Sequence, residues 1–185
     1  ARFGSVSLLG SAVGLSLVRE LGPVLTALII VGRVGSATCA ELGIMRTDNQ
    51  IDAIECMAID PYRYLLLPRF MAFLIAAPLL TAIFDVVGIF GGWFVGVVVF
   101  KVNQGAYFTS MADTVLLADL TMGITKSVIF GVLIAWICMA KGFLMHQNHG
   151  MVFGAEGVSS ATTAAVVVAS ISILYADFAI SALML

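Results

Sequence analysis

Four long apolar stretches, separated by more polar connections, dominate this amino-acid sequence. They cover residues 21–40, 70–100, 122–140 and 158–185. Each stretch holds a single charged side chain, in chain order Arg33, Asp85, Lys126 and Asp177. A helix needs about 20 predominantly apolar residues to cross the hydrocarbon core of a bilayer. The sequence therefore predicts an all-α integral membrane protein, a polytopic helical bundle with four spans in this chain.

The composition of the chain excludes the other broad classes of protein. Of its 185 residues, 61% are hydrophobic and 11% are charged, and the mean hydropathy is +1.10. Soluble domains carry about 45–50% apolar and about 25% charged residues, and a soluble protein of this size still exposes about a third of its unfolded surface. Disorder, collagen and a disulfide scaffold do not fit either. The net charge of −2 offers no basic surface for nucleic acid.

A further apolar stretch, residues 3–18, precedes the first span and ends at Arg19-Glu20-Leu21-Gly22-Pro23. The two stretches together are too long for one straight span and too short for a hairpin of two. We therefore expect one long helix, bent near Gly22-Pro23. Because the chain begins with Ala1 and runs almost at once into apolar sequence, we expect residues 1–185 to be a single, N-terminally incomplete transmembrane domain.

Basic residues in the connections between spans predict the orientation in the membrane. The connections 41–69 and 141–157 together carry four Lys or Arg residues, whereas 101–121 carries one. Cytoplasmic loops are enriched in Lys and Arg. We therefore expect the first two connections in the cytoplasm, and the third connection and the C-terminus on the other side.

Two ladders of small residues predict where helices pack closely. The ladders, with steps of four residues, are Gly32, Ser36 and Ala40 in the first span and Gly88, Gly92 and Gly96 in the second. Small side chains on one helix face let two helix backbones approach within a membrane. We expect these residues to serve helix packing rather than chemistry.

Charged residues inside the spans are the first candidate functional residues. On translocon scales a centred Asp, Lys or Arg costs about 2.5–3.5 kcal/mol, so each needs a partner, a wet cavity or a route to the surface. Arg19 and Glu20 add an adjacent pair of opposite sign. Two interpretations stay open: structural pairs between helices, or a polar, partly hydrated cavity that binds a charged or amphipathic molecule.

A short amphipathic helix in the connection 41–69 is the second candidate. Thr47-Asp48-Asn49-Gln50 fits a capping box that opens a helix, and Asp60-Pro61 predicts a stop, so the helix should end near Ala58. The acidic stripe comprises Asp48, Asp52 and Glu55, and the apolar stripe comprises Ile51, Ile54 and Ala58. Such a helix is either a solvated connector or a docking surface for a soluble partner.

Patterns for catalysis and for ligand binding by this chain alone are incomplete. Gly123-Ile124-Thr125-Lys126-Ser127 ends in Lys-Ser but lacks the rest of a phosphate-binding loop. His146 and His149 lie in a short Gly-bearing loop without a nearby carboxylate pair, so no metal site is predicted. An intramembrane enzyme needs a nucleophile–base pair, and none is found.

Several motifs resemble, in order along the chain, those of the MlaE (YrbE) family of permeases. They are Arg19-Glu20-Leu21-Gly22-Pro23, Gly32-Arg33-Val34-Gly35-Ser36-Ala37, Ala40-Glu41-Leu42-Gly43 with Met45, Gln50-Ile51-Asp52-Ala53-Ile54-Glu55, Asp60-Pro61, Pro68-Arg69, Gly154-Ala155-Glu156-Gly157-Val158, Ala161-Thr162-Thr163-Ala164 and Asp177. The chain departs from the family at three positions. Family members often carry Glu where this chain has Asn49, and Arg where it has Ser160 and Ala164. The resemblance covers nearly the whole chain.

Members of this family are the membrane subunits of MCE-associated ABC transporters that carry phospholipids and maintain outer-membrane lipid asymmetry. The resemblance implies a five-span, non-catalytic subunit of the bacterial inner membrane, paired with a second copy of itself around a lipid pocket. It also implies a separate cytoplasmic ABC ATPase that binds ATP and Mg, a small STAS-domain protein and a hexameric periplasmic MCE-domain protein. No cofactor is expected in this chain.

The resemblance also assigns candidate site residues. The implied lipid-binding residues are Arg19, Glu20, Lys126 and Asp177. The residues implied to couple to the ATPase, on the cytoplasmic coupling loop 41–69, are Glu41, Met45, Gln50, Asp52, Glu55 and Asp60. The alternative function is an ion-coupled secondary carrier or channel, with Asp85, Lys126 and Asp177 as a relay.

Overall fold

A computed structural model describes residues 9–99, 101, 103–145 and 154–184, and these residues are almost entirely helical. The α-helices are α2 (Leu9–Ser16), α3 (Gly22–Ile30), α4 (Ser36–Thr47), α5 (Gln50–Cys56), α6 (Leu67–Trp93), α7 (Gln104–Thr114), α8 (Leu117–Phe143) and α9 (Ala155–Met184). Four π-helical segments join or extend them: η1 (Leu17–Leu21), η2 (Val31–Gly35), η3 (Tyr62–Leu66) and η4 (Phe94–Val99). These elements confirm the predicted all-α class.

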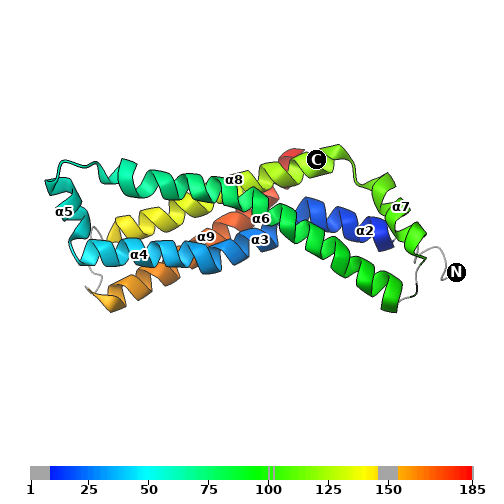
Figure 1. Cartoon of the computed structure of the whole chain (residues 1–185), viewed down its shortest axis with the longest axis horizontal. Helices are drawn as coiled ribbons and strands as arrows, with labels where there is room; N and C mark the ends of the chain where they lie inside the picture. Colours follow the sequence, from blue (N-terminus) through cyan, green and yellow to red (C-terminus); the bar gives the residue numbers. More distant parts are fainter. Residues whose placement is uncertain (1–8, 100, 102, 146–153, 185) are drawn as a thin grey trace.

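Four helical stretches in the described part of the chain are long and apolar enough to cross a membrane, as the sequence predicted. They are Gly10–Thr47, Tyr62–Val99, Leu117–Phe143 and Ala155–Leu183. Figure 1 shows that they run along the long axis of the molecule. The third stretch begins five residues earlier than the predicted start at 122, and it therefore includes Asp119.

The first span is one continuous helix, as predicted, with an irregular turn just before Gly22-Pro23. This turn is η1, which lies between α2 and α3. Proline has no N–H, and its ring clashes with the carbonyl of the residue four positions earlier, here Arg19. A wider π-helical turn relieves such crowding. Because Pro23 donates no hydrogen bond, the carbonyls of this turn receive one backbone hydrogen bond fewer than in a regular helix.

The helix predicted in the connection 41–69 is confirmed as α5, but its predicted capping box is wrong. Helix α4 continues through Thr47, whose Oγ1 donates to the carbonyl of Gly43 at 2.9 Å. The chain then turns at Asn49, which has a left-handed backbone with φ 56° and directly precedes α5. Asn adopts this conformation more readily than most residues. Ala58 lies beyond the end of α5 and is exposed, so it does not extend the apolar stripe.

Helices α5 and α7 lie at opposite ends of the bundle (Figure 1). The alternation of four spans explains this placement, because α5 follows the first span and α7 follows the second. Helix α7 packs against α2, and it starts at Asn103, whose Oδ1 accepts a hydrogen bond from the N–H of Gly105 at 3.0 Å. Which end faces the cytoplasm stays a prediction.

Helix α8 is the central span of the described bundle. In its most apolar window 56% of the residues are buried, against 17% for the span that contains α6 and 11% for α9. The core takes buried side chains from all four spans, including Val31, Phe73, Phe130 and Ile173. The outer faces of α6 and α9 are consequently apolar and exposed, which suits contact with lipid or with another membrane helix.

The second glycine ladder lies at close approaches within the chain. A Cβ at Gly88 would lie 2.9 Å from Leu17, and a Cβ at Gly92 would lie 2.8 Å from the Tyr107 hydroxyl. A Cβ at Gly96 would be in ordinary contact with the Tyr107 ring, at 3.5 Å. These glycines bring α6 and η4 against the first span and α7.

The first ladder differs from the second. The Cβ position of Gly32 has no neighbour within 4 Å in the described part of the chain. Ser36 is half-buried, and its Oγ donates to the carbonyl of Gly32 at 2.6 Å, within the same helix. A packing role for Gly32 and Ser36 stays a prediction, and it requires a neighbouring helix that is not among the described residues.

We expect Gly92→Leu to lower the free energy of unfolding by about 1–3 kcal/mol, the usual cost of overpacking. The new side chain would meet Val13 and the buried Tyr107. Gly91→Leu is the matched control, because nothing lies within 4 Å of a Cβ at that adjacent position. Thermal unfolding in detergent measures the difference, and equal midpoints for the two variants would contradict the expectation.

Candidate functional site

The side chain of Lys126 is fully buried and has four polar partners. Its Nζ donates to Glu20 Oε2 and to Ser181 Oγ, both at 2.7 Å, and to the backbone carbonyl of Arg19 at 3.1 Å. It also forms an ion pair with Asp177, whose Oδ1 lies 2.9 Å away. The first, third and fourth spans therefore meet at one point, and we name Glu20, Lys126, Asp177 and Ser181 the Lys126 cluster.

Two local features of the sequence bring α8 against η1 at this point. Gly123 lies one turn before Lys126, and a Cβ there would be 2.6 Å from the backbone oxygen of Val18. A glycine permits this approach of two backbones. In the first span, Pro23 leaves the nearby carbonyls with one donor fewer, and the Arg19 carbonyl accepts from Lys126 instead.

Arg19 pairs with Asp119, a residue that the sequence analysis missed. Arg19 Nε donates to Asp119 Oδ1 at 2.6 Å. Asp119 Oδ2 accepts from the backbone N–H of Leu116 at 2.9 Å, just before α8 begins. The available signal was an acidic residue at the third position of a helix, where its carboxylate can accept from the N–H of the capping residue. It was overlooked because the third span was predicted to begin at 122.

The Lys126 cluster is buried on the α8 side and exposed on the side of the first span. The Lys126 side chain is fully buried, whereas the side chains of Glu20 and Arg19 are 45% and 47% exposed. With the Arg19–Asp119 pair, the site holds two cations and three carboxylates, and thus one net negative charge. At its open edge, Arg19 can pair with a phosphate and Glu20 can accept from an amine or a hydroxyl.

Two other charged residues in the spans lie apart from the Lys126 cluster. The Oδ1 atom of Asp85, on α6, is buried against Gly22 and has no hydrogen-bond partner among the described residues. Arg33, on η2, is exposed and forms no ion pair with any described residue. The alternative function, an ion-coupled carrier, uses Asp85, Lys126 and Asp177 as a relay. Lys126 forms an ion pair with Asp177 but not with Asp85.

The residues predicted to couple to an ATPase lie around the α5 end of the bundle. Three of them form ion pairs, namely Glu41 with Arg69 at 3.1 Å, Asp52 with Arg46 at 2.7 Å and Asp60 with Arg63 at 3.8 Å. Gln50 Nε2 donates to Asp48 at 3.4 Å, and Glu55 is exposed. These residues form a charged surface, and its coupling role stays a prediction.

A small core holds α5 in place. Ile51 is buried with Leu65 and Phe143, and Met45 packs against them. Met45 therefore supports the fold of this end from within. In the described part of the chain, no three His, Cys, Asp or Glu side chains gather as a metal site, and His146 and His149 lie outside the described residues.

We expect Asp119→Ala to lower the free energy of unfolding by about 1–2 kcal/mol. The loss combines a helix cap, worth about 1 kcal/mol, with a part-exposed ion pair worth up to about 1 kcal/mol. Asp119→Asn keeps an oxygen for the Leu116 N–H and should lose about half as much. Asp113→Ala, at an exposed position on α7, is the control. A thermal midpoint as low for Asp113→Ala as for Asp119→Ala would refute the assignment.

Four apolar spans around a buried ion cluster define this chain as a multi-pass helical membrane protein. The sequence model described as Permease MlaE matches residues 1–183. The chain therefore belongs to the MlaE permease family.

Individual relatives agree with this family. The chain is 41% identical over 183 residues to the intermembrane phospholipid transport system permease protein MlaE of Haemophilus influenzae, covering 98% of this chain and 68% of the relative. It is 40% identical to a probable ABC transporter permease protein of Rickettsia typhi, covering 100% of this chain and 69% of the relative. It is 33% identical to the chloroplastic protein TRIGALACTOSYLDIACYLGLYCEROL 1 of Arabidopsis thaliana, covering 97% of this chain and 50% of the relative.

Proposed function

We propose that this protein is the permease subunit of an ABC transporter that moves phospholipids between the inner and outer membranes of a bacterium and maintains outer-membrane lipid asymmetry. The match of residues 1–183 to the permease family, with 41% identity to a relative named for intermembrane phospholipid transport, carries the proposal. The chain itself performs no reaction. A separate cytoplasmic ABC ATPase binds ATP and Mg²⁺ and hydrolyses the ATP.

In this proposal the phospholipid headgroup contacts the open edge of the Lys126 cluster. Arg19 and Glu20 face the headgroup because their side chains are half exposed. Lys126 pairs with the Glu20 carboxylate and Ser181 donates a hydrogen bond to it, while Asp177 pairs with Lys126. ATP binding can drive transport only if the lipid makes different contacts in the two conformations of the permease.

The proposed assembly places each partner at a different surface. A second copy of this chain packs against the exposed membrane faces, with the lipid between the copies. The ATPase, associated with a STAS-domain protein, docks at the charged α5 end, which faces the cytoplasm. A hexameric MCE-domain protein receives or delivers lipid at the α7 end, in the periplasm.

Reconstitution of the complete transporter tests the function. Donor proteoliposomes with radiolabelled phospholipid are incubated with the MCE-domain partner, and lipid exchange with that partner is measured. We expect exchange to require ATP and to stop with a non-hydrolysable analogue. Exchange that is indifferent to ATP would refute the proposal. Ion-driven transport by the permease alone would instead support a secondary carrier.

Photo-crosslinking tests the proposed lipid site separately. A photoreactive residue at position 20 should capture phospholipid in the assembled transporter, because Glu20 is at the open edge of the cluster. The same probe at position 55, on α5, should capture protein rather than lipid. If position 20 never captures lipid while transport is normal, the Lys126 cluster is a structural ion pair and the headgroup binds elsewhere.

We expect Glu55→Lys to reduce co-purification of the ATPase several-fold, because reversing a charge at an interface opposes a complementary partner. Glu55 is exposed and forms no ion pair with a described residue, so its reversal should leave the permease inserted and folded. Asp52→Lys should have a larger effect, since it also breaks the pair with Arg46. Asp113→Lys, at the opposite end, is the control. Undiminished ATPase recovery and ATP turnover with Glu55→Lys would contradict the predicted docking surface.

A further inference from the structure

At the Lys126 cluster and the neighbouring Arg19, carboxylates outnumber cations. Lys126 is shared by Glu20 and Asp177, and Arg19 is paired with Asp119. No other Lys or Arg of the described residues forms an ion pair with these three carboxylates. Glu20 is the most exposed of the three, at 45% against 21% for Asp177 and 4% for Asp119. One negative charge is therefore uncompensated, and a counter-ion can approach it best at Glu20.

Glu20 and Arg19 also have hydrogen-bonding capacity left at this exposed edge. The Glu20 carboxylate accepts from Lys126 at 2.7 Å and from Ser181 at 3.2 Å, whereas a carboxylate can accept about four hydrogen bonds. Arg19 uses its Nε for Asp119, and its two Nη groups have no hydrogen-bond partner among the described residues. The edge thus offers free acceptors at Glu20 and free donors at Arg19.

The free donors and acceptors are arranged along one face of α8. Asp119 and Lys126, the partners of Arg19 and Glu20, are seven residues apart on that helix, which is two turns or about 10.5 Å. A headgroup that lies along this edge can place its phosphate at Arg19 and a second polar group at Glu20. Because Glu20 has only acceptors left, the second group must donate hydrogen bonds.

Phospholipid headgroups differ in how well they meet this requirement. A primary ammonium has three N–H donors and a positive charge, and hydroxyl groups donate without carrying a charge. The quaternary ammonium of choline has the charge but no N–H. A headgroup with a phosphate and a primary ammonium supplies both the donors and the missing positive charge, whereas an anionic headgroup brings a second uncompensated negative charge.

We propose that the Lys126 cluster and Arg19 select phospholipids with a primary amine beside the phosphate, as in phosphatidylethanolamine, over anionic phospholipids. The ammonium pairs with Glu20 and the phosphate pairs with Arg19. An anionic headgroup of the phosphatidylglycerol type is disfavoured, because like charges repel across a binding interface. This inference rests on the proposed function, since it requires a lipid headgroup at the exposed edge.

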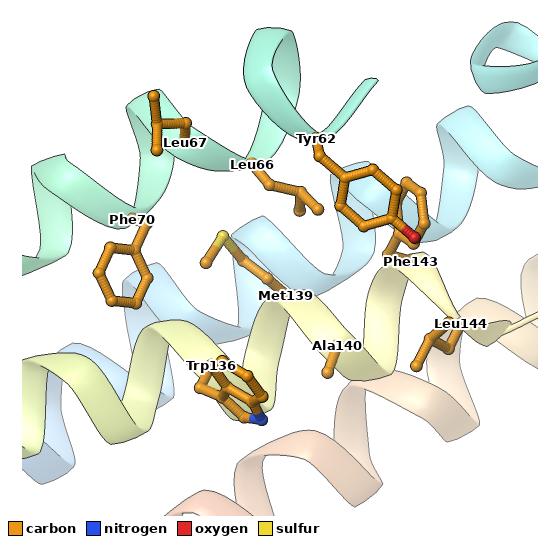
Figure 2. Close-up of a pocket in the computed structure, with 9 residues that line it drawn as sticks. All are labelled: Tyr62, Leu66, Leu67, Phe70, Trp136, Met139, Ala140, Phe143 and Leu144. Atoms are coloured by element: carbon orange, nitrogen blue, oxygen red, sulfur yellow. The ribbon is translucent and has the colours of Figure 1, made fainter. Parts of the chain in front are cut away.

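The apolar pocket shown in Figure 2 offers no comparable contacts. It lies between η3, α6 and α8, has a volume of about 370 Å³ and is lined by residues that include Phe70, Trp136 and Phe143. None of the described residues that line it is charged, so it can neither pair with a phosphate nor attract an amine. Along α8 it begins roughly 15 Å beyond Lys126, at 1.5 Å per residue. Headgroup selection is therefore assigned to the Lys126 cluster and Arg19.

Photo-crosslinking in a mixed bilayer tests the selection. The complete transporter is placed in nanodiscs with equal parts of phosphatidylethanolamine, phosphatidylcholine and phosphatidylglycerol. A photoreactive residue replaces Leu21, which is 46% exposed and adjacent to Glu20, so that Arg19 and Glu20 stay intact. The captured lipids are identified by mass. The same probe at Ile75, which is 64% exposed on α6, reports the composition of the surrounding bilayer.

We expect position 21 to capture phosphatidylethanolamine about fivefold more than phosphatidylglycerol, the effect of one charge. Phosphatidylcholine should lie between them, because it shares the net charge of phosphatidylethanolamine but cannot donate to Glu20. Position 75 should capture all three equally.

Charge variants test the cause of the preference. Glu20→Gln removes the excess negative charge, so capture at position 21 should become nearly equal for phosphatidylethanolamine and phosphatidylglycerol. Asp119→Asn removes one carboxylate charge from the other pair and should have the same effect, which keeps the test decisive if Glu20→Gln fails to fold. Glu55→Gln, an equal change of charge at an exposed α5 position, is the matched control and should keep the fivefold preference.

Three results would overturn the inference. Equal capture of the three lipids at position 21, with ATP-dependent lipid exchange intact, refutes headgroup selection and leaves the proposed function standing. A preference that survives both Glu20→Gln and Asp119→Asn has its origin elsewhere. No lipid at position 21 while exchange still requires ATP means that the headgroup binds at another site. Exchange that is indifferent to ATP contradicts the proposed function itself and is measured independently of capture.

Discussion

Lys126→Met is expected to lower the free energy of unfolding by about 3 kcal/mol, the lower end of the range for breaking a buried ion pair. The change leaves the carboxylates of Glu20 and Asp177 facing each other without their shared cation. The lower end applies because 45% of the Glu20 side chain is exposed, so water still solvates part of that charge. Unfolding in mixed micelles by titration with a denaturing detergent measures the loss.

Rescue separates the ion pair from the loss of packing. In a background of Glu20→Gln and Asp177→Asn, the same Lys126→Met change should cost far less, because no unpaired charge is left behind. Lys141→Met, at a half-buried position near the end of α8, serves as the control for removing a lysine. If Lys126→Met is as stable as the parent, the cluster is not what holds the three spans together.

Gly142→Leu is expected to destabilise the protein by about 3 kcal/mol or more, the upper end of the cost of overpacking. A Cβ at this position would lie 2.7 Å from the backbone oxygen of Cys39 and 3.0 Å from Leu42 Cβ. Backbone of α4 cannot rotate out of the way as a flexible side chain can. Helices α4 and α8 must therefore separate where the α5 end is attached to the spans.

A graded series tests this contact. Gly142→Ala should already cost a measurable part of the loss, since its Cβ alone is too close to Cys39, and Gly91→Leu should cost little. The loss of α4 packing should also raise protease sensitivity at α5. A Gly142→Leu protein with the parent's thermal midpoint would mean that the two helices separate without cost.

Much of the fold could be predicted from the sequence because lipid imposes a simple length rule on apolar helices. The four spans, the long first helix and the short α5 all follow from hydropathy and from Pro23 or Pro61. The turn before α5 could not be predicted in detail. Thr47 fits a capping position, but its hydroxyl is equally satisfied inside a helix by the Gly43 carbonyl. The choice between these depends on how far α4 packs against α8.

The candidate site could be predicted only as isolated residues. Each of Lys126 and Asp177 is the lone charge of its own span, and the cost of an unpaired charge in lipid predicts that each has a partner. The identity of each partner depends on how distant spans pack against one another, and local sequence patterns do not reveal this. Asp119 shows the limit, because its partner Arg19 is 100 residues away and only the folded bundle brings them together.

The Lys126 cluster also has a consequence for how this chain enters the membrane during synthesis. Its members come from the first, third and fourth described spans, and the ribosome makes them in that order. When the third span leaves the translocon, Lys126 has Glu20 as its partner, while Asp177 and Ser181 have not yet been made. The fourth span then brings Asp177 into the bilayer, where its counter-ion, Lys126, is already present. The fourth described span is thus held in its place by a charge that was inserted before it.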